Sequence, residues 1–165
     1  MEFRSIEELK ENGFEGFISV EKLQADSSLI PKKMGVYMVL FPDGQKVEFL
    51  SKGTGGHFKD KNPNVEIKIL EESWINETPI IYIGKAGGQE SSATLQSRLK
   101  QYLKFGQGQK IGHWGGRYIW QVKDSKNLIF CWKALSDKEP REEEATLIES
   151  FKEKFRKRPF ANLVK

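Results

Sequence analysis

The fold of this chain is decided by Met-Gly-Val-Tyr-Met-Val-Leu-Phe at residues 34–41 and Pro-Ile-Ile-Tyr-Ile-Gly at residues 79–84. Both segments are rich in β-branched and aromatic residues, so each is expected to form a strand. The first strand ends at the turn at residues 42–44, and we expect residues 45–50 to pair back across it. Neither segment approaches the roughly 20 apolar residues of a membrane span, so no membrane partner is expected.

The segments around these two strands alternate between helix and strand patterns. Apolar spacing predicts helices over residues 5–12 and 94–105, and a last helix that begins at Ser136 or Asp137 and ends near Lys157. Alternating apolar residues predict a strand at residues 65–69, and residues 117–122 and 128–134 are expected to form a hairpin. The glycine-rich and lysine-rich residues 51–64 predict a mobile surface loop. The predicted fold class is α+β, with a small antiparallel sheet flanked by helices.

The chain has 165 residues, with 27 Lys and Arg against 23 Asp and Glu. Residues 85–117 carry six basic residues against Glu90 alone, and residues 150–165 carry six against Glu153. Two basic segments are compatible with a polyanionic partner, but charge alone favours an ordinary solvated, mixed-charge surface. The single cysteine, Cys131, and only two histidines exclude a disulfide framework, a cysteine-based zinc site and a histidine-rich metal site. A reducing, cytoplasmic compartment is expected.

The last helix presents two candidate carboxylates. Glu144 precedes Ile148 by four residues, so it is expected on the buried side of the helix with Phe151 and Phe155. A carboxylate in that position needs a cation, a metal or a proton. Glu143 competes for the inward position, and an exposed glutamate in the first turns would simply favour the helix dipole. The pattern alone leaves these interpretations open.

Other residues can be explained either by packing or by chemistry. Arg98 lies at the edge of the apolar side of its helix, and Tyr37 and Tyr82 lie in strong strands close to glycines. Trp114 and Arg117 lie in a glycine-rich loop, where they could contact a base and a phosphate or cover one end of the core.

In this order, these residues resemble the motifs of the GIY-YIG nuclease family. The matching elements are Gly35-Val36-Tyr37, Tyr82-Ile83-Gly84, Arg98, Glu144 and Asn162. The resemblance spans residues 29–163. Within the family, this part of the chain is similar to the nuclease domain of bacterial excision-repair endonucleases and to homing and restriction endonucleases. It selects Glu144 over Glu143. It also implies one GIY-YIG-like domain over residues 1–165, with an N-terminal extension at 1–28 and an insertion at 43–78.

The resemblance implies a metal-dependent endonuclease that hydrolyses phosphodiester bonds in DNA. Glu144 would hold one divalent ion, Mg²⁺ or Mn²⁺, and Arg98 would stabilise charge on the scissile phosphate. Tyr82 would orient water or phosphate, and Asn162 would brace the site. Since no separate DNA-binding domain is recognisable, the insertion and the loop around His113 are candidates for that role.

Tyr37 would help to activate the attacking water. A free phenol has a pKa of about 10, so it needs a nearby cation or a proton relay to act as a base. Lys85 is the candidate cation and His113 the candidate relay. The residues expected to contact the nucleic acid are Lys85, Lys100, Lys104, Trp114 and Arg117.

Two other functions remain compatible with the sequence. One is a nucleic-acid-binding module that keeps the fold without cutting. The other is an unrelated interaction domain in which all five matching elements are packing residues. The preference for DNA or RNA and the oligomeric state are left open by the sequence.

Overall fold

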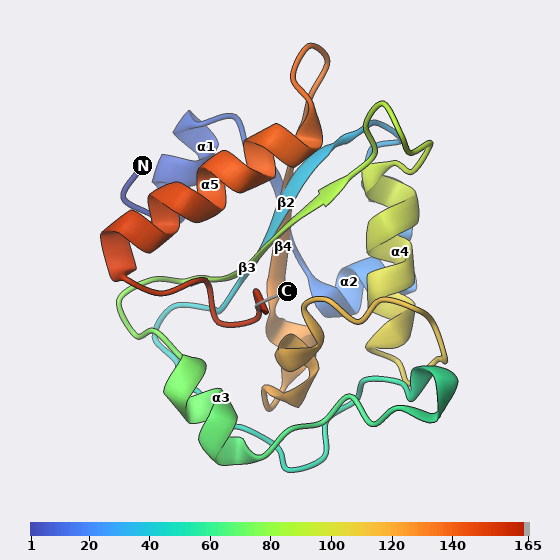
Figure 1. The fold of residues 1–165 in the computed structure, drawn as a ribbon, viewed down its shortest axis with the longest axis vertical. Coiled ribbons are helices and arrows are strands. Elements are labelled where there is room, and N and C mark those ends of the chain that lie inside the picture. The colour runs from blue at the N-terminus through green and yellow to red at the C-terminus, as the bar shows by residue number, and fades with distance from the viewer. Residues whose placement is uncertain (164–165) are drawn as a thin grey trace.

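The computed structural model describes residues 1–163, which form an α+β fold with a four-stranded sheet and five α-helices (Figure 1). In chain order the elements are α1 Ile6–Glu11, β1 Glu15–Ser19, α2 Val20–Ala25, β2 Gly35–Leu40, α3 Ile67–Ser73, β3 Ile80–Ala86, α4 Leu95–Phe105, β4 Ile129–Ala134 and α5 Pro140–Phe155. None of the helices in this part of the chain has the length and apolarity needed to cross a membrane. The α+β prediction is confirmed.

The sheet is open and antiparallel, with the strand order β1-β4-β2-β3. Every residue of β2 is buried, because side chains pack on both of its faces. Val36, Met38 and Leu40 belong to the cluster that includes residues of α1 and α5. Tyr37 and Val39 belong to the cluster that includes residues of α2 and α4. The two helices that matter for the site, α4 and α5, therefore pack on opposite faces of the sheet.

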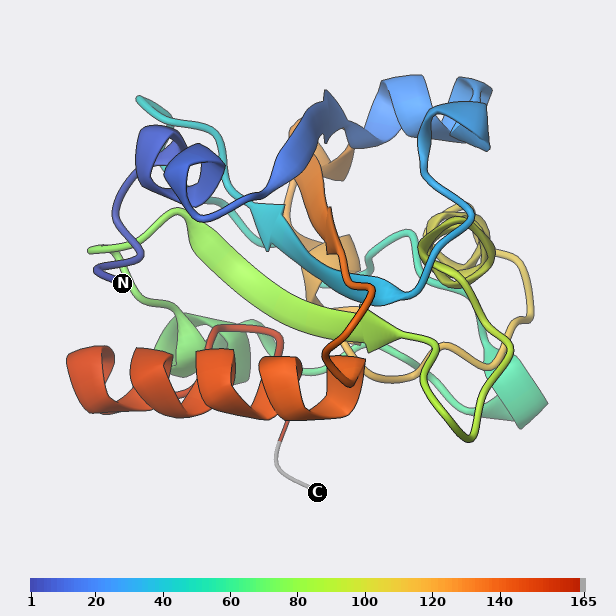
Figure 2. The ribbon, with the colours of Figure 1, turned by 90° about the horizontal axis from the view of Figure 1, so that it is seen from above.

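Strand β3 is an edge strand, and the C-terminal segment covers its open side. The Ala161 amide donates a hydrogen bond to the Ile81 carbonyl over 2.8 Å. The Asn162 side chain accepts from the Ile83 amide and donates to the Ile83 carbonyl, each over 2.9 Å. These bonds satisfy backbone groups that an exposed edge would leave open. Figure 2 shows α5 running along β3 and α4 seen end-on at the other side of the sheet.

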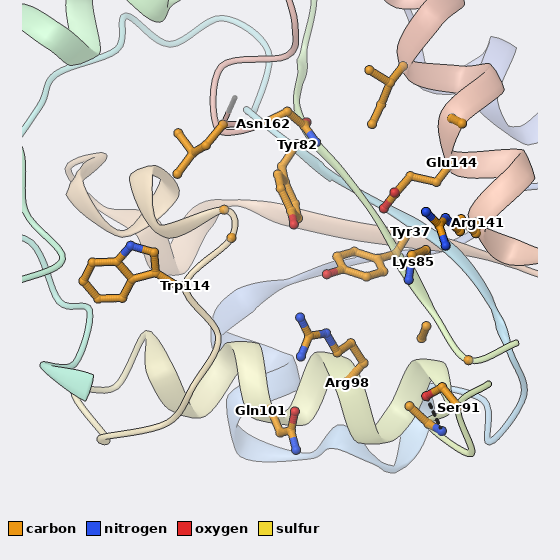
Figure 3. Close-up of a pocket in the computed structure, with 18 of the residues that line it drawn as sticks. Tyr37, Tyr82, Lys85, Ser91, Arg98, Gln101, Trp114, Arg141, Glu144 and Asn162 are labelled. Carbon is orange, nitrogen blue, oxygen red and sulfur yellow. Dashed lines mark hydrogen bonds between the residues drawn. The ribbon is translucent and has the colours of Figure 1, made fainter. Parts of the chain in front are cut away.

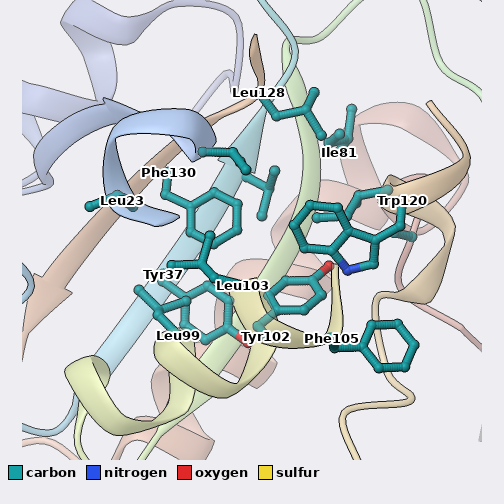
Figure 4. Close-up of a cluster of buried hydrophobic side chains, with 14 of the residues drawn as sticks. Leu23, Tyr37, Ile81, Leu99, Tyr102, Leu103, Phe105, Trp120, Leu128 and Phe130 are labelled. Carbon is teal, nitrogen blue, oxygen red and sulfur yellow. The ribbon is translucent and has the colours of Figure 1, made fainter. Parts of the chain in front are cut away.

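Helix α4 begins at Thr94, which forms a capping box with Ser97. Its apolar side carries Tyr102 into the centre of a buried cluster, where the ring lies between Trp120 and Phe130 at centroid separations of 5.4 Å and 5.8 Å (Figure 4). This packing fixes the rotation of α4, and so determines which of its residues face away from the core.

Residues 65–69 do not form the predicted strand. Helix α3 covers most of this segment, and it buries Leu70 while Ile69 remains 40% exposed. Ile67, Leu70 and Trp74 are spaced three and four residues apart, which is helical spacing. The alternation that predicted a strand was too short to exclude this second pattern.

The predicted pairing of residues 45–50 with the first strand is also wrong. Phe49 instead forms a bridge with Val122, and the Leu50 amide donates to the Gln121 carbonyl over 2.7 Å. The predicted hairpin is wrong for its first half, since residues 117–121 form a 3₁₀ helix. Its second half is β4, which pairs with β1 and β2 instead.

The last helix begins later than predicted. Its N-cap is Glu139, not Ser136 or Asp137, and Pro140 occupies its first turn. The Glu139 carboxylate makes no cap bond and accepts from the Gln89 amide over 3.2 Å. The helix ends at Phe155, near the predicted end.

Gln121 joins the segment between β2 and β3 to the 3₁₀ helix Arg117–Gln121. Its side chain accepts from the Val65 amide over 2.9 Å and donates to the carbonyls of Val65 and Leu50 over 2.9 Å and 3.0 Å. The residue is 1% exposed, so water does not replace these bonds easily.

Gln121→Ala should therefore lower the free energy of unfolding by about 1–3 kcal/mol, because three partly buried backbone groups lose their partner. Urea unfolding measures this change. Gln107→Ala, at an exposed position, is the matched control and should change stability by less than about 0.5 kcal/mol. Equal stability of the two variants would contradict the bracing role of Gln121.

Candidate active site

A cavity of about 950 Å³ lies beside β3, between α4 and α5 (Figure 3). Its wall combines residues from β2, β3, α4, α5, the loop before the 3₁₀ helix and the C-terminal segment. The sequence-predicted site residues that line it are Tyr37, Tyr82, Lys85, Arg98, Trp114, Arg117, Glu144 and Asn162. Residues from six separate parts of the chain thus meet at one place.

Tyr37 and Tyr82 face the cavity because of the register of two strands. Tyr37 pairs directly with Gly84, and Tyr82 is paired with Val39, so the two tyrosines are diagonal neighbours on one face. Their ring centroids lie 6.0 Å apart. Gly84 is essential to this arrangement, because a methyl group there would lie 2.5 Å from the Tyr37 hydroxyl.

Both phenols are held in their neutral form. Burial raises the pKa of Tyr37 well above its usual range, and the neighbouring Tyr82 and Glu144 raise it further. Burial and the Glu144 charge raise the pKa of Tyr82 to about 12. Arg98 lowers the pKa of both tyrosines, but burial outweighs it. In this structure the two hydroxyls can donate or accept hydrogen bonds, but they do not serve as bases near neutral pH.

Arg98 and Glu144 approach the cavity from different helices. Arg98 is half-buried on α4, at the edge of the side that carries the core residues Leu99 and Tyr102, because Tyr102 follows it by four residues. Glu144 lies in the second turn of α5 and points into the cavity, as does Arg98 (Figure 3). Since α4 and α5 cover opposite faces of the sheet, these side chains meet only by reaching around the β3 edge.

The alternative carboxylate, Glu143, has a different environment. It is 8% exposed and forms an ion pair with Lys138, and it does not line the cavity. The buried side of α5 contains Glu143, Leu147 and Phe151. The predicted inward stripe was therefore displaced by one residue, and Glu144 faces the cavity because it lies beside that stripe.

The cavity carries an excess of positive charge. Its cationic residues are Lys85, Arg98, Arg117, Arg141 and Arg158, and its carboxylates are Glu144 and Glu149. Sequence reasoning missed Arg141 and Arg158. Arg141 precedes Glu144 by three residues on a helix, so their shared side could have been predicted from spacing. Arg158 follows the end of α5, where no periodic pattern applies.

Trp114 and Arg117 form one unit in the cavity wall. The Arg117 guanidinium lies 4.7 Å from the centroid of the Trp114 ring and donates to the Trp114 carbonyl over 3.4 Å. The edge of Trp114 also faces Phe105, at a centroid distance of 6.5 Å. Trp114 is half-buried, so it contributes both to packing and to the cavity surface.

The structure does not place three of the predicted site residues at the cavity. Lys100 and Lys104 lie on α4 but do not line it. His113 is fully buried and stacks on Tyr102 at a centroid distance of 4.1 Å. Neither of its ring nitrogens has a hydrogen-bond partner within residues 1–163. Burial lowers the pKa of His113 to about 3. This placement supports a packing role for His113 rather than a proton relay.

The described residues include no group of three or more His, Cys, Asp or Glu side chains that could hold a metal ion. The carboxylates that line the cavity are Glu144 and Glu149, so a metal at this site would take most of its ligands from water and substrate. Comparison of the chain with protein-family models, curated proteins and solved structures found no match. The proposal for function consequently depends on the cavity and on the motif resemblance.

Gly84→Ala tests the contact that places Tyr37. The added methyl group overlaps the Tyr37 phenol, so we expect a loss of about 1–3 kcal/mol in unfolding free energy and a changed tyrosine signal in near-ultraviolet circular dichroism. The control is Gly115→Ala, whose methyl group would lie 3.5 Å from the Tyr82 hydroxyl, an ordinary contact. If both variants are equally stable, the close approach at Gly84 does not determine the position of Tyr37.

His113→Phe tests the buried imidazole. Because folding lowers the pKa of His113, the neutral imidazole stabilises the fold above pH 6.5, and this contribution is lost as the pH falls toward 3. We expect up to roughly 4 kcal/mol of acid destabilisation in the wild type that His113→Phe lacks. Urea unfolding at pH 7 and pH 4 measures the difference. A pH dependence that is identical in both proteins would contradict the buried, neutral state of His113.

Proposed function

We propose that this chain is a metal-dependent endonuclease that hydrolyses phosphodiester bonds in DNA. The observation that carries the proposal is the convergence of Tyr37, Tyr82, Arg98, Glu144 and Asn162 on one cavity, although they are distributed over residues 37–162. These are the same residues on which the resemblance to GIY-YIG nucleases rests. If the five matches were only packing residues, they would not need to surround a common open space.

The charge of the cavity supports an anionic substrate. Five cationic side chains face two carboxylates, which gives the lining a formal excess of three positive charges. A phosphodiester backbone brings regularly spaced negative charges to such a surface. Arg98 would stabilise the charge that develops on the scissile phosphate, because its guanidinium offers a planar set of donors at the cavity centre.

The single cavity carboxylate from the motif, Glu144, fits a hard divalent ion such as Mg²⁺ or Mn²⁺, which retains most of its waters and needs few protein ligands. When bound, such an ion supplies Lewis-acid polarisation of the phosphate. Among the cavity residues, Tyr82 would orient a phosphate oxygen or water through its hydroxyl. Asn162 would hold the β3 edge in place through its two bonds to Ile83.

A specific observation favours the second candidate function, a nucleic-acid-binding module that does not cut. Burial holds Tyr37, the candidate base, in its neutral form, and His113, the candidate relay, does not line the cavity. The same cationic cavity would then bind a phosphate backbone without hydrolysing it.

A cytoplasmic location is proposed for either function, because the one cysteine, Cys131, is a free and buried core residue.

Glu144→Gln separates the two functions. If the chain is an endonuclease, the neutral isostere should reduce Mg²⁺-dependent cleavage of plasmid DNA by at least about 10²-fold, while binding and thermal stability stay near wild type. Glu143→Gln is the matched control: it makes the same change one residue earlier, but outside the cavity, so its cleavage rate should stay within a few-fold of wild type. Wild-type protein that binds DNA but does not cut it with Mg²⁺ or Mn²⁺ would favour the non-cleaving module.

A further inference from the structure

A second positively charged surface lies outside the cavity, where two loops that are distant in sequence pack together. Residues 51–61 belong to the segment between β2 and β3, and residues 104–112 follow the end of α4. The Gly56 amide donates to the Phe105 carbonyl over 3.0 Å, and the Thr54 amide donates to the Trp120 carbonyl over 3.0 Å. We call residues 51–61 and 104–112 the two-loop platform.

The close packing of the platform depends on glycine. Gly56 lies directly against the backbone of Gln109, where any side chain would overlap the carbonyl group. Gly112 lies against the Phe58 ring, since a methyl group on Gly112 would lie 3.2 Å from it. Residues 51–64, predicted as a mobile surface loop, therefore make defined contacts with residues 105–112. The platform is a defined surface that two parts of the chain build together.

The platform carries the entire net charge of the protein. Its charged residues are Lys52, Lys59, Lys61, Lys104 and Lys110, with Asp60 as the only acid. Five of the 27 basic residues and one of the 23 acidic residues therefore lie here, which leaves 22 of each sign in the rest of the chain. All of these lysines are exposed except Lys104, which is half-buried.

The platform is continuous with the cavity wall. Residues 113–117 lead directly from it to Trp114 and Arg117, which line the cavity. The chain segment that follows the platform therefore enters the cavity wall within five residues. The uncharged side chains of Gln107 and Gln109 on this surface are also exposed.

We propose that the two-loop platform binds the phosphate backbone of the DNA duplex that flanks the cleavage site. The platform extends the footprint of the enzyme beyond the cavity without taking part in the reaction. This inference rests on the proposed function, since it uses the same substrate.

The test compares two DNA ligands, a hairpin with a stem of about 6 bp that fills the cavity region and a duplex of about 24 bp that also reaches the platform. Both carry a fluorescent label, and binding is measured by anisotropy over a range of salt concentrations, with EDTA present to prevent cleavage. The platform variant combines Lys59→Gln, Lys61→Gln and Lys110→Gln. The matched control combines Lys10→Gln, Lys22→Gln and Lys46→Gln, which are exposed and lie outside the cavity and the platform.

The platform variant should bind the long duplex on the order of 10²–10³-fold more weakly than wild type, with the salt slope reduced by about two to three. Its affinity for the short hairpin should change less than about threefold, and the control variant should bind both ligands like wild type. Cleavage of the short hairpin with Mg²⁺ should persist in the platform variant.

Three results would overturn the proposal. Equal loss in the platform and control variants would show a general charge effect rather than a binding surface. Tighter binding of a double-stranded RNA of the same sequence and length would assign the surface to RNA. If the platform variant binds the long duplex like wild type and cleaves normally, the platform proposal is rejected while the proposed function stands. A wild-type protein that binds neither DNA ligand would instead reject the proposed function together with the platform.

Discussion

The Tyr37 ring lies against Gly84, and the rest of the site depends on this contact between β2 and β3. A residue with a side chain at position 84 would displace the phenol, so the two strands could not keep both their register and their aromatic face. Tyr37 in turn packs beside Tyr102, at a centroid distance of 6.4 Å, and this contact links the strand pair to α4. The position of α4, and of Arg98 on it, therefore depends in part on the contact between Tyr37 and Gly84.

The edge position of β3 is the second constraint. Because α4 and α5 cover different faces of the sheet, an interior strand between them would keep Arg98 and Glu144 apart. Because β3 is an edge strand, side chains from α4 and α5 can both extend past its open edge into the same cavity. The C-terminal segment then closes the hydrogen-bonding edge through Ala161 and Asn162, so β3 is protected from pairing with another chain.

Elements whose apolar pattern continued over a long segment could be predicted from the sequence. Strands β2 and β3 and helices α4 and α5 are all within a few residues of their predicted bounds, and their order placed the motif residues on the expected elements. The segment between β2 and β3 could not be predicted in the same way. Its structure depends on long-range bonds to residues 105, 120 and 121, and no local pattern encodes these bonds.

Adjacent residues on a helix point about 100° apart, so the choice between Glu143 and Glu144 needed the exact orientation of α5. That orientation is set by Leu147 and Phe151, which pack into the core and turn Glu143 inward toward Lys138. The cavity cations Arg141 and Arg158 could not be assigned from the sequence for a similar reason. In the sequence, each resembles an ordinary surface arginine, and only the positions of the other elements that line the cavity show that it belongs there.

The electrostatics of the cavity connect Glu144 to the tyrosines in a way that bears on the reaction. The Glu144 charge is one of the causes that raise the pKa of Tyr37 and Tyr82, so neutralising that charge makes both phenols easier to ionise. A phosphate beside the phenols would act in the opposite direction, because a second negative charge raises a phenol pKa further. Removal of Glu144 thus leaves the tyrosines more acidic than before. This direction holds for the metal-free protein. Under the proposed function, Glu144→Gln would also release the divalent ion, whose positive charge favours the ionised phenol, so the substitution changes the two influences on the tyrosines in opposite directions.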